Sequence, residues 1–452
     1  MSIYFALIYL LFFLYVYIYL NEKKLFYIVS ISIILKFLFI TFWTYFKYPF
    51  LSGDAYLYWD KANLIANTKD FFIDKAIPSS FMPSTYGINL LTLINAFFIK
   101  FLSSNALQIK YVIISCHIIS TILIFNITKR VFNRSSAYIS TIIFSFWPSY
   151  LIWFSANYKE PLIITSILSF IYLLQKIKIS DGYKKKITYI VILFLIFFFQ
   201  YYLQSIIIII ELVSLIIYIL FFYFNIYFKI IILNLFFIII LTNLNRIENI
   251  LIDGLWDVAQ HAETQARVDD AGFFQYRFFE IDKFAKNWCF PYNFNYKLQN
   301  NCNEIKYIRK KIYIKTKKWL KQSELYSSLN IFGWITSLFI GLYYAIFSPF
   351  PWSIGSINQL IFAPFMYIWY LILLFFIFSI KKLIEINKFK EVFFSISILI
   401  LSYIIMALSE GNIGGVFRHR DWVNFIIIII SSYSINEFIK KTKNNNKKTI
   451  DF

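Results

Sequence analysis

The sequence predicts an all-α protein that crosses a membrane many times. Of its 452 residues, 60% are hydrophobic and 22% are aromatic, and the mean hydropathy is +0.64. Apolar runs of about 20 residues, the length that a helix needs to cross the hydrocarbon core, recur along the whole chain. From this recurrence we expect roughly 10 to 13 membrane-spanning helices.

The net charge of +20 is carried mostly by short basic clusters between the apolar runs. Such clusters are typical of cytoplasmic loops and of contact with the anionic headgroups of membrane lipids. The charge therefore does not indicate binding to nucleic acid. The five clusters lie at residues 21–24, 129–134, 176–186, 381–390 and 440–448.

The positive-inside rule gives a direction to each apolar run. The first run, residues 3–20, has no basic region before it and no small-residue cleavage site after it, so we expect a retained span. With all five clusters in the cytoplasm, the chain runs outward at 25–46, 136–154 and 392–408 and returns at 106–128.

This threading divides the chain into four parts. Two or three spans fit between 187 and 245, and the side of the polar insert that follows changes with that number; we expect an extracytoplasmic insert. The parts are an N-terminal helical module (1–245) whose first outer loop (47–105) carries short in-plane helices, the insert (246–328), C-terminal transmembrane helices (329–440) and a basic cytoplasmic tail (441–452).

Two polar stretches on the expected outer face offer carboxylates. In "GDAYLYWDKANLI" the side chain of Asp54 can accept a proton or bind a divalent ion, or it simply caps a helix. In "NYKEP", Lys159 and Glu160 precede Pro161 at the start of a helix, whose positive end favours a bound phosphate. The alternative for this second stretch is a snorkelling lysine beside a capping glutamate.

The third outer stretch, "GNIGGVFRHRD", contains Arg418, His419 and Arg420. Arginine binds phosphate oxygens in a planar fork and stays charged. The two arginines point to different sides if the segment is helical and to the same side if it is extended. His419 is either a hydrogen-bond donor or a spacer. The simpler alternative for the whole stretch is a topology anchor.

Two further features of the sequence are not explained by the predicted membrane topology. The prolines of "FSPFPWSIGSINQL" break a helix between apolar segments, which predicts a hinge at the membrane interface. Glu211 lies inside an apolar run, where an ionisable group is costly. We expect it to be neutral and bonded to a neighbouring helix.

In chain order, the motifs "GDAYLYWDKA", "YG" at 86–87, "FWPSYLIWFSANYKEPL", "SPFPW" and "GNIGGVFRHR" resemble those of bacterial glycosyltransferases of the GT-C class. The motifs are similar to those of family 39, which resembles protein O-mannosyltransferases and lipid A aminoarabinose transferases. The resemblance runs from residue 50 to residue 435 and leaves out the insert.

The resemblance implies a GT-C-like, inverting enzyme of the bacterial plasma membrane. Such an enzyme transfers a sugar from a polyprenyl-phosphate donor to an acceptor at the extracytoplasmic face. It implies Asp54 as the catalytic base and, with Glu160, as a ligand of a divalent metal ion. The family usually has an Asp-Glu pair in the first loop, where this chain has Asp54 and Ala55. The implied donor-phosphate ligands are Arg418, Arg420, Lys159 and His419, and the implied substrate-binding residues are Tyr58, Asp60, Tyr86 and Glu160.

Two other functions fit the same sequence features. One is an oligosaccharide polymerase or ligase with a lipid-pyrophosphate donor, because such proteins also have many spans and outer-face arginines. The other is a transporter or flippase for a lipid-linked sugar. A transporter is expected to carry more ionisable groups or broken helices at mid-membrane depth, and usually an inverted repeat.

Overall fold

The computed structural model describes residues 22–46, 53–67, 90–102, 106–180, 182–223, 339, 342–343, 345–352, 357–409 and 413–450. These residues are almost entirely helical and include no strand. The predicted all-α fold class is therefore confirmed. Tyr86 and the insert 246–328 lie outside the described residues.

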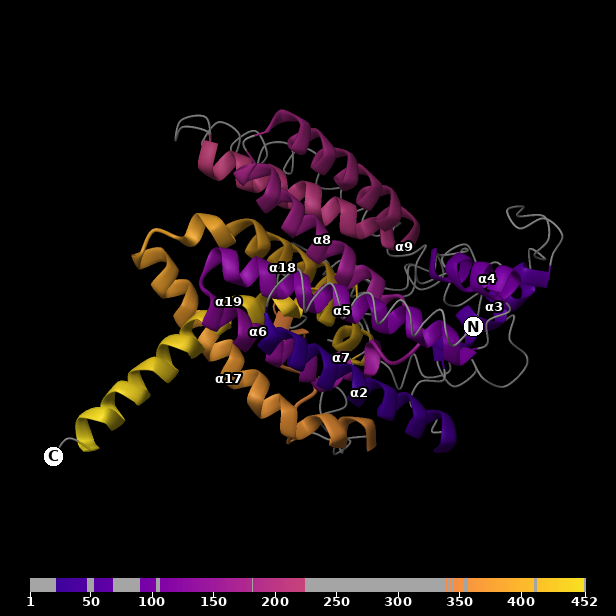
Figure 1. Ribbon diagram of the computed structural model, residues 1–452, viewed down its shortest axis with the longest axis horizontal. Helices are drawn as coiled ribbons and strands as arrows, with labels where there is room; N and C mark the ends of the chain where they lie inside the picture. Colours follow the sequence, from indigo (N-terminus) through magenta and orange to yellow (C-terminus); the bar gives the residue numbers. More distant parts are fainter. Residues whose placement is uncertain are drawn as a thin grey trace, which may run out of the picture.

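The helices form an elongated bundle (Figure 1). Eight helical segments in the described residues are long and apolar enough to cross a membrane, as expected for a polytopic membrane protein. The larger predicted number of spans stays a prediction. The helices are α2 (Lys23–Phe46), α3 (Gly53–Asn67), α4 (Leu90–Leu102), α5 (Ala106–Val131), α6 (Arg134–Phe146), α7 (Pro148–Trp153), α8 (Glu160–Ile179), α9 (Tyr183–Tyr223), α17 (Ile357–Glu385), α18 (Phe389–Ser409) and α19 (Ile413–Ile450).

Helix α19 forms the centre of the bundle. Its residues from 420 to 432 are all buried, and it packs against α17, α6, α18 and α8. The window of α19 that is apolar enough to cross a membrane is 72% buried, whereas the two apolar segments of α9 are 11% and 22% buried. The exposed apolar side chains of α9 suit contact with lipid, so α9 lies at the margin of the bundle.

Helix α9 is a helical hairpin with its turn at Gln204. The backbone of Gln204 is non-helical, with φ −166° and ψ 94°. Across the turn, Nε2 of Gln200 donates to Oε1 of Glu211 at 3.0 Å. Residues 11 apart on a straight helix would be separated by roughly 16 Å along its axis, so this bond requires the chain to fold back. Glu211 is therefore bonded to the opposite arm of the hairpin, which agrees with the predicted bond to a neighbouring helix. That its carboxyl group is neutral stays a prediction.

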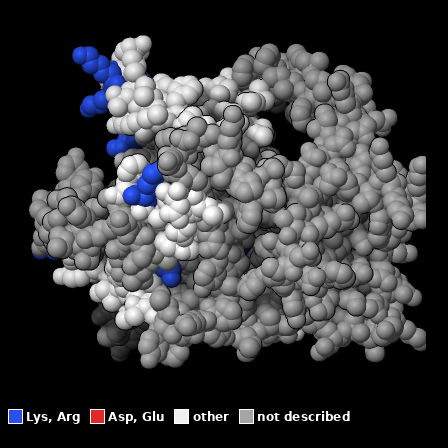
Figure 2. Space-filling model, turned by 90° about the vertical axis from the view of Figure 1, so that its right-hand side faces the viewer, with Lys and Arg blue, Asp and Glu red and all other residues white. Residues whose placement is uncertain are grey.

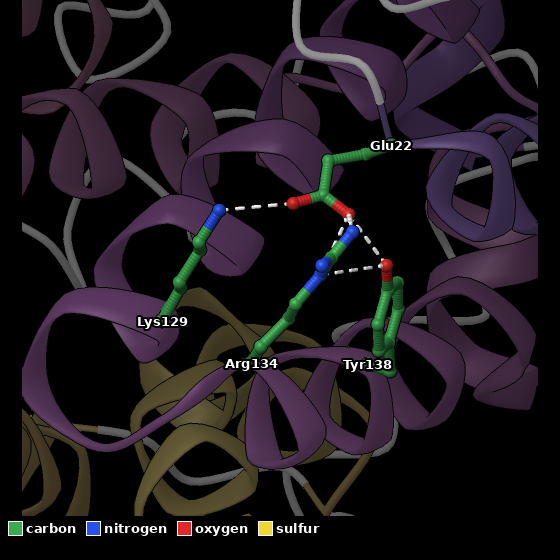
Figure 3. Close-up of polar contacts among 4 residues, drawn as sticks. All are labelled: Glu22, Lys129, Arg134 and Tyr138. Carbon is green, nitrogen blue, oxygen red and sulfur yellow. Dashed lines mark hydrogen bonds and ion pairs between the residues drawn. The ribbon is translucent and has the colours of Figure 1, made fainter.

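One end of the bundle is built around Glu22, which joins three helices (Figure 3). Its carboxylate accepts hydrogen bonds from Lys129 at 2.9 Å, from Arg134 at 2.6 Å and from Tyr138 at 2.5 Å. Burial raises the pKa of Glu22, but the bonds from Tyr138, Lys129 and Arg134 outweigh burial and hold it below its ordinary value. The carboxylate is therefore charged at neutral pH and ties the start of α2 to the end of α5 and the start of α6.

The other basic clusters lie at this same end. Val131, Gln175 and Glu391 line one small pocket, which brings the ends of α5 and α8 to the start of α18. On α19, Asn436 donates to Oδ1 of Asn133 at 3.4 Å, and Glu437 pairs with Lys382 at 3.2 Å. We call this the basic end; it is at the left in Figure 1. The clusters gather there as the positive-inside rule predicts for cytoplasmic loops.

Candidate functional site

At the opposite end of the bundle, the first turns of α8 and α19 meet. Nε of Arg418 donates a short hydrogen bond to Oε1 of Glu160, across 258 residues of sequence. Between Arg418 and Asn436, α19 rises by roughly 27 Å, close to the thickness of a membrane's hydrocarbon core. We call this the site end, and it lies about one membrane thickness from the basic end.

The start of α8 holds Glu160 in place. The helix begins at Glu160 with Pro161 in its first turn, as predicted. A carboxylate in that turn is stabilised by the unpaired N–H groups and by the positive end of the helix dipole. The side chain of Glu160 is 0% exposed, and its second oxygen, Oε2, has no hydrogen-bond partner among the described residues. In the described part of the structure, the positive charge of Arg418 compensates the negative charge of the buried Glu160.

The guanidinium of Arg418 is held from a second direction by an aromatic ring. It lies 4.7 Å from the ring centroid of Tyr158, a distance suited to a cation–π interaction. The side chain of Arg418 is 14% exposed, so it reaches the surface of the described part. Glu160 and Tyr158 thus hold an arginine that is still partly exposed.

Lys159 points to the turn of the α9 hairpin. Its Nζ donates to Oε1 of Gln204 at 2.8 Å and lies 6.0 Å from the ring centroid of Trp422. The ring of Trp422 is in contact with that of His419, with centroids 4.5 Å apart. Lys159 is partly exposed and bonds to the turn of α9, and His419 joins the same group.

Arg418 and Arg420 diverge because the segment is helical from residue 413 onward. Arg420 is 2% exposed, and its Nη1 donates to the backbone carbonyls of Ser348, Ala345 and Ile346. Its guanidinium also lies 5.7 Å from the ring of Trp369. In this arrangement Arg420 is enclosed by the bundle, whereas Arg418 is accessible.

The two prolines of the "SPFPW" stretch explain why carbonyls are available there. Proline has no N–H, so the carbonyls four residues before Pro349 and Pro351 have no helical donor. The first of them, on Ala345, accepts from Arg420 at 3.3 Å, and the second, on Phe347, accepts from the hydroxyl of Tyr370 at 2.8 Å. The predicted break in the helix is present, and α17 and α19 supply the missing donors.

A second buried carboxylate, Asp421, was not selected from the sequence. Its two oxygens accept from Nε1 of Trp153 at 2.7 Å and from Nδ2 of Asn424 at 2.9 Å. The hydroxyl of Tyr403 donates to Asn424 at 2.6 Å, and that of Tyr150 to the backbone carbonyl of Asp421 at 3.0 Å. Both carboxylate oxygens and the backbone carbonyl of Asp421, and Oδ1 of Asn424, have donors, so this group joins α7, α18 and α19 as a structural network.

The remaining predicted site residues lie partly outside the described structure. Asp54 and Asp60 are on the backbone of α3, but their side chains are not among those described; Tyr58 is buried, at 2% exposed. Across the described residues no group of three or more His, Cys, Asp and Glu could hold a metal ion. The predicted metal site at Asp54 and Glu160 stays a prediction, and Glu160 is engaged by Arg418.

Figure 2 views the molecule from the right-hand side of Figure 1, the direction of the site end. Charged atoms on the described surface visible from this side belong to lysine and arginine, and no described acidic residue is visible there. Visible charge on the described surface of this side is therefore positive.

The fold and the site define a polytopic helical membrane protein with a compact charged group at one end of its bundle. In that group Arg418, Lys159, His419 and Glu160 come from sequence-distant helices. Gln204, Tyr158 and Trp422 complete it. Tyr158 lies in the "NYKEP" stretch but was not selected from the sequence, and no motif indicated Gln204 or Trp422. Comparison of the chain with models of known protein families, and with the sequences of curated proteins, finds no match.

Proposed function

We propose that this protein is a membrane glycosyltransferase that takes a sugar from a polyprenyl-phosphate donor at the extracytoplasmic face of a bacterial plasma membrane. The observation that carries the proposal is the contact between Glu160 and Arg418. It joins the "NYKEP" and "GNIGGVFRHRD" stretches opposite the basic end, where the positive-inside rule predicts the outer face. Both stretches belong to the motifs that resemble the GT-C class.

Arg418 and Lys159 are the groups that receive the donor phosphate. Arg418 supplies a fixed guanidinium at the surface, and Lys159 supplies a second cation from the adjacent helix start. His419, against Trp422, is a further donor at the edge. Arg420 is left out of this phosphate site because its guanidinium already serves three buried carbonyls.

In the reaction, a hydroxyl or amine of the acceptor attacks the anomeric carbon of the donor. The bond from that carbon to the phosphate oxygen breaks, and the electron pair leaves with the phosphate. Asp54 on α3 is the proposed base that takes the acceptor's proton. Arg418 and Lys159 stabilise the negative charge that develops on the leaving phosphate.

The hairpin α9 offers a place for the donor's polyprenyl tail. Its arms are largely exposed and apolar, and its turn bonds to Lys159 through Gln204. A lipid lying along the hairpin would therefore bring its phosphate to the cations at the site end. An apolar tail needs no specific side chains, since burial of its carbons is sufficient.

The test is a transfer assay with protein reconstituted in liposomes and a panel of radiolabelled polyprenyl-phosphate sugars. Wild type is expected to release sugar from one member of the panel, and Asp54→Asn and Arg418→Ala are expected to lose this activity. The control is Arg134→Ala, because Arg134 pairs with Glu22 at the basic end. Unchanged turnover in both site variants, or no release from any donor, would overturn the proposal.

A lipid-linked sugar transporter is the second candidate, on one observation. Inside the apolar spans, the structure holds Lys36 bonded to His117 and Glu211 bonded to Gln200. Polar groups at that depth often mark a transport pathway. Movement of the labelled lipid across the liposome without sugar release would favour transport. Release from polyprenyl-pyrophosphate oligosaccharides alone would favour the polymerase or ligase.

A further inference from the structure

The position of Glu160 poses a chemical question, because it places a negative charge inside a proposed phosphate site. Its Oε1 is bonded to Arg418, its Oε2 has no partner in the part of the chain that the structure describes, and both are fully buried. Lys159 and Arg418 would together suit a phosphate that carries two negative charges. With Glu160 beside them, the three side chains have a net charge of only +1.

We propose that Glu160 is an exchangeable counter-ion for Arg418, which gives way to the donor's phosphate and returns to expel the product's phosphate. This proposal rests on the proposed function. Glu160 is a positioning residue here and takes no part in bond making. The inference concerns which step it controls, namely release of the lipid phosphate.

The charges of donor and product differ, which gives the exchange its direction. A polyprenyl-phosphate sugar is a phosphodiester and carries a single negative charge. Transfer of the sugar leaves a phosphate monoester, whose charge near pH 7 is about −1.5 to −2. Two cations without a competing carboxylate would hold this product more tightly than the donor. A tethered carboxylate at Arg418 weakens that hold.

The surrounding geometry allows the carboxylate to detach while Arg418 stays in place. The ring of Tyr158, 4.7 Å from the guanidinium, holds Arg418 independently of Glu160. The backbone at Glu160 is fixed by the start of α8 and by Pro161, so the displaced carboxylate remains near its partner. A counter-ion on a rigid helix start competes at high effective concentration.

The experiment measures binding of two simple probes to the full chain in nanodiscs: decyl phosphate, a monoester, and methyl decyl phosphate, a diester. Glu160→Gln is expected to bind the monoester at least about tenfold more tightly than wild type, since a contacting charge is worth that much even at an effective dielectric near 20. The diester is expected to gain less. Arg418→Ala is expected to weaken binding of both probes.

The matched control is Glu437→Gln, which removes an ion-paired carboxylate from the other end of α19. Glu437 pairs with Lys382 at 3.2 Å and with Lys440 at 3.1 Å. This variant is expected to leave both affinities unchanged. Where the proposed transfer is measurable, Glu160→Gln is expected to keep the single-turnover rate and to lower kcat and KM together, because product release becomes slower.

The outcomes separate the exchange from the proposed function. Failure of wild type to bind either probe overturns the phosphate site itself. Binding that depends on Arg418 but is not tighter in Glu160→Gln overturns the exchange and leaves the phosphate site intact. Loss of the single-turnover rate in Glu160→Gln also overturns it, because Glu160 would then act in the chemical step. If Glu160→Gln does not fold, Glu160→Asp carries the test: its shorter side chain is expected to raise monoester affinity by a smaller factor, and no rise overturns the exchange.

Discussion

Nζ of Lys36 lies 3.1 Å from Nε2 of His117 in the interior of the bundle. It also donates to Oγ of Ser32 at 2.9 Å and to the backbone carbonyl of Ser145 at 3.3 Å. An ammonium group has three donors, and these are three acceptors. The carbonyl of Ser145 belongs to the last turn of α6, where the helix dipole is negative and favours a cation.

This arrangement predicts the tautomer of His117. Oγ of Ser32 also lies 2.8 Å from Nε2 of His117. If Lys36 or Ser32 donates to Nε2, that nitrogen is unprotonated and the proton of the neutral ring is on Nδ1. Nitrogen-15 spectra of histidine-labelled protein are expected to show the Nδ1–H form for the signal that disappears in His117→Gln. The chain has three histidines, so the assignment is simple. An Nε2–H form in wild type would contradict the proposed donation, and Lys36→Met is expected to change the signal.

The Glu22 cluster predicts a loss of stability in acid. The folded-state pKa of Glu22 lies below its ordinary value of 4.5, so its contribution is complete above 4.5 and is lost as the pH falls through the folded-state pKa. At neutral pH, Glu22→Gln is expected to cost about 1 to 2 kcal/mol, since its cationic partners are partly exposed. Thermal unfolding in detergent is expected to show this difference shrinking below pH 4.5. A constant difference down to pH 3 would contradict the prediction.

Arg418 and Arg420 are expected to differ in what their removal does. Arg420→Ala leaves buried carbonyls without their donor and is expected to destabilise the fold by about 3 to 5 kcal/mol. Arg418→Ala leaves the buried carboxylate of Glu160 without its cation, so a loss of stability of similar size is expected. The two variants are expected to differ in phosphate binding, which only Arg418→Ala weakens. Unfolding and decyl phosphate binding are measured on both. A stable Arg420→Ala variant that binds no phosphate would return Arg420 to the phosphate site.

The hydrogen bond between Gln200 and Glu211 predicts that the hairpin tolerates glutamine at position 211 better than alanine. Glutamine at position 211 keeps an oxygen that accepts from Gln200, so Glu211→Gln is expected to stay within about 1 kcal/mol of wild type. Glu211→Ala removes the nearer of two acceptors of the buried Gln200 amide, the other being Oγ of Ser166 at 3.3 Å, and is expected to cost about 1 to 3 kcal/mol. Unfolding in detergent checks both. Loss of transfer or transport in a stable Glu211→Gln variant would show that the carboxylate has a functional role.

The sequence predicted the features that depend on composition and local pattern. Apolar length and basic clusters indicated a multi-span all-α fold, and Pro161 marked the start of α8. From the sequence, Glu160 and Arg418 could be placed only on the same face of the membrane. Their contact could not be predicted, because residues 258 positions apart leave no local signal. The same holds for Gln204: nothing in an apolar run marks one glutamine as the turn of a hairpin. Arg420 was grouped with Arg418 because both are arginines in one motif, and only the helical backbone separates their directions.

The hairpin of α9 also determines at which end of the bundle Tyr223 lies, before the insert. Tyr183 follows the basic loop after α8, and the ring of Tyr223 lies 4.7 Å from Nζ of Lys390 at the basic end. Two passes return the chain to its starting side, so Tyr183 and Tyr223 lie at the same end of the bundle. The apolar run of the sequence that ends near residue 245 is long enough for one more pass. One crossing there would place the insert on the same side of the membrane as Glu160 and Arg418.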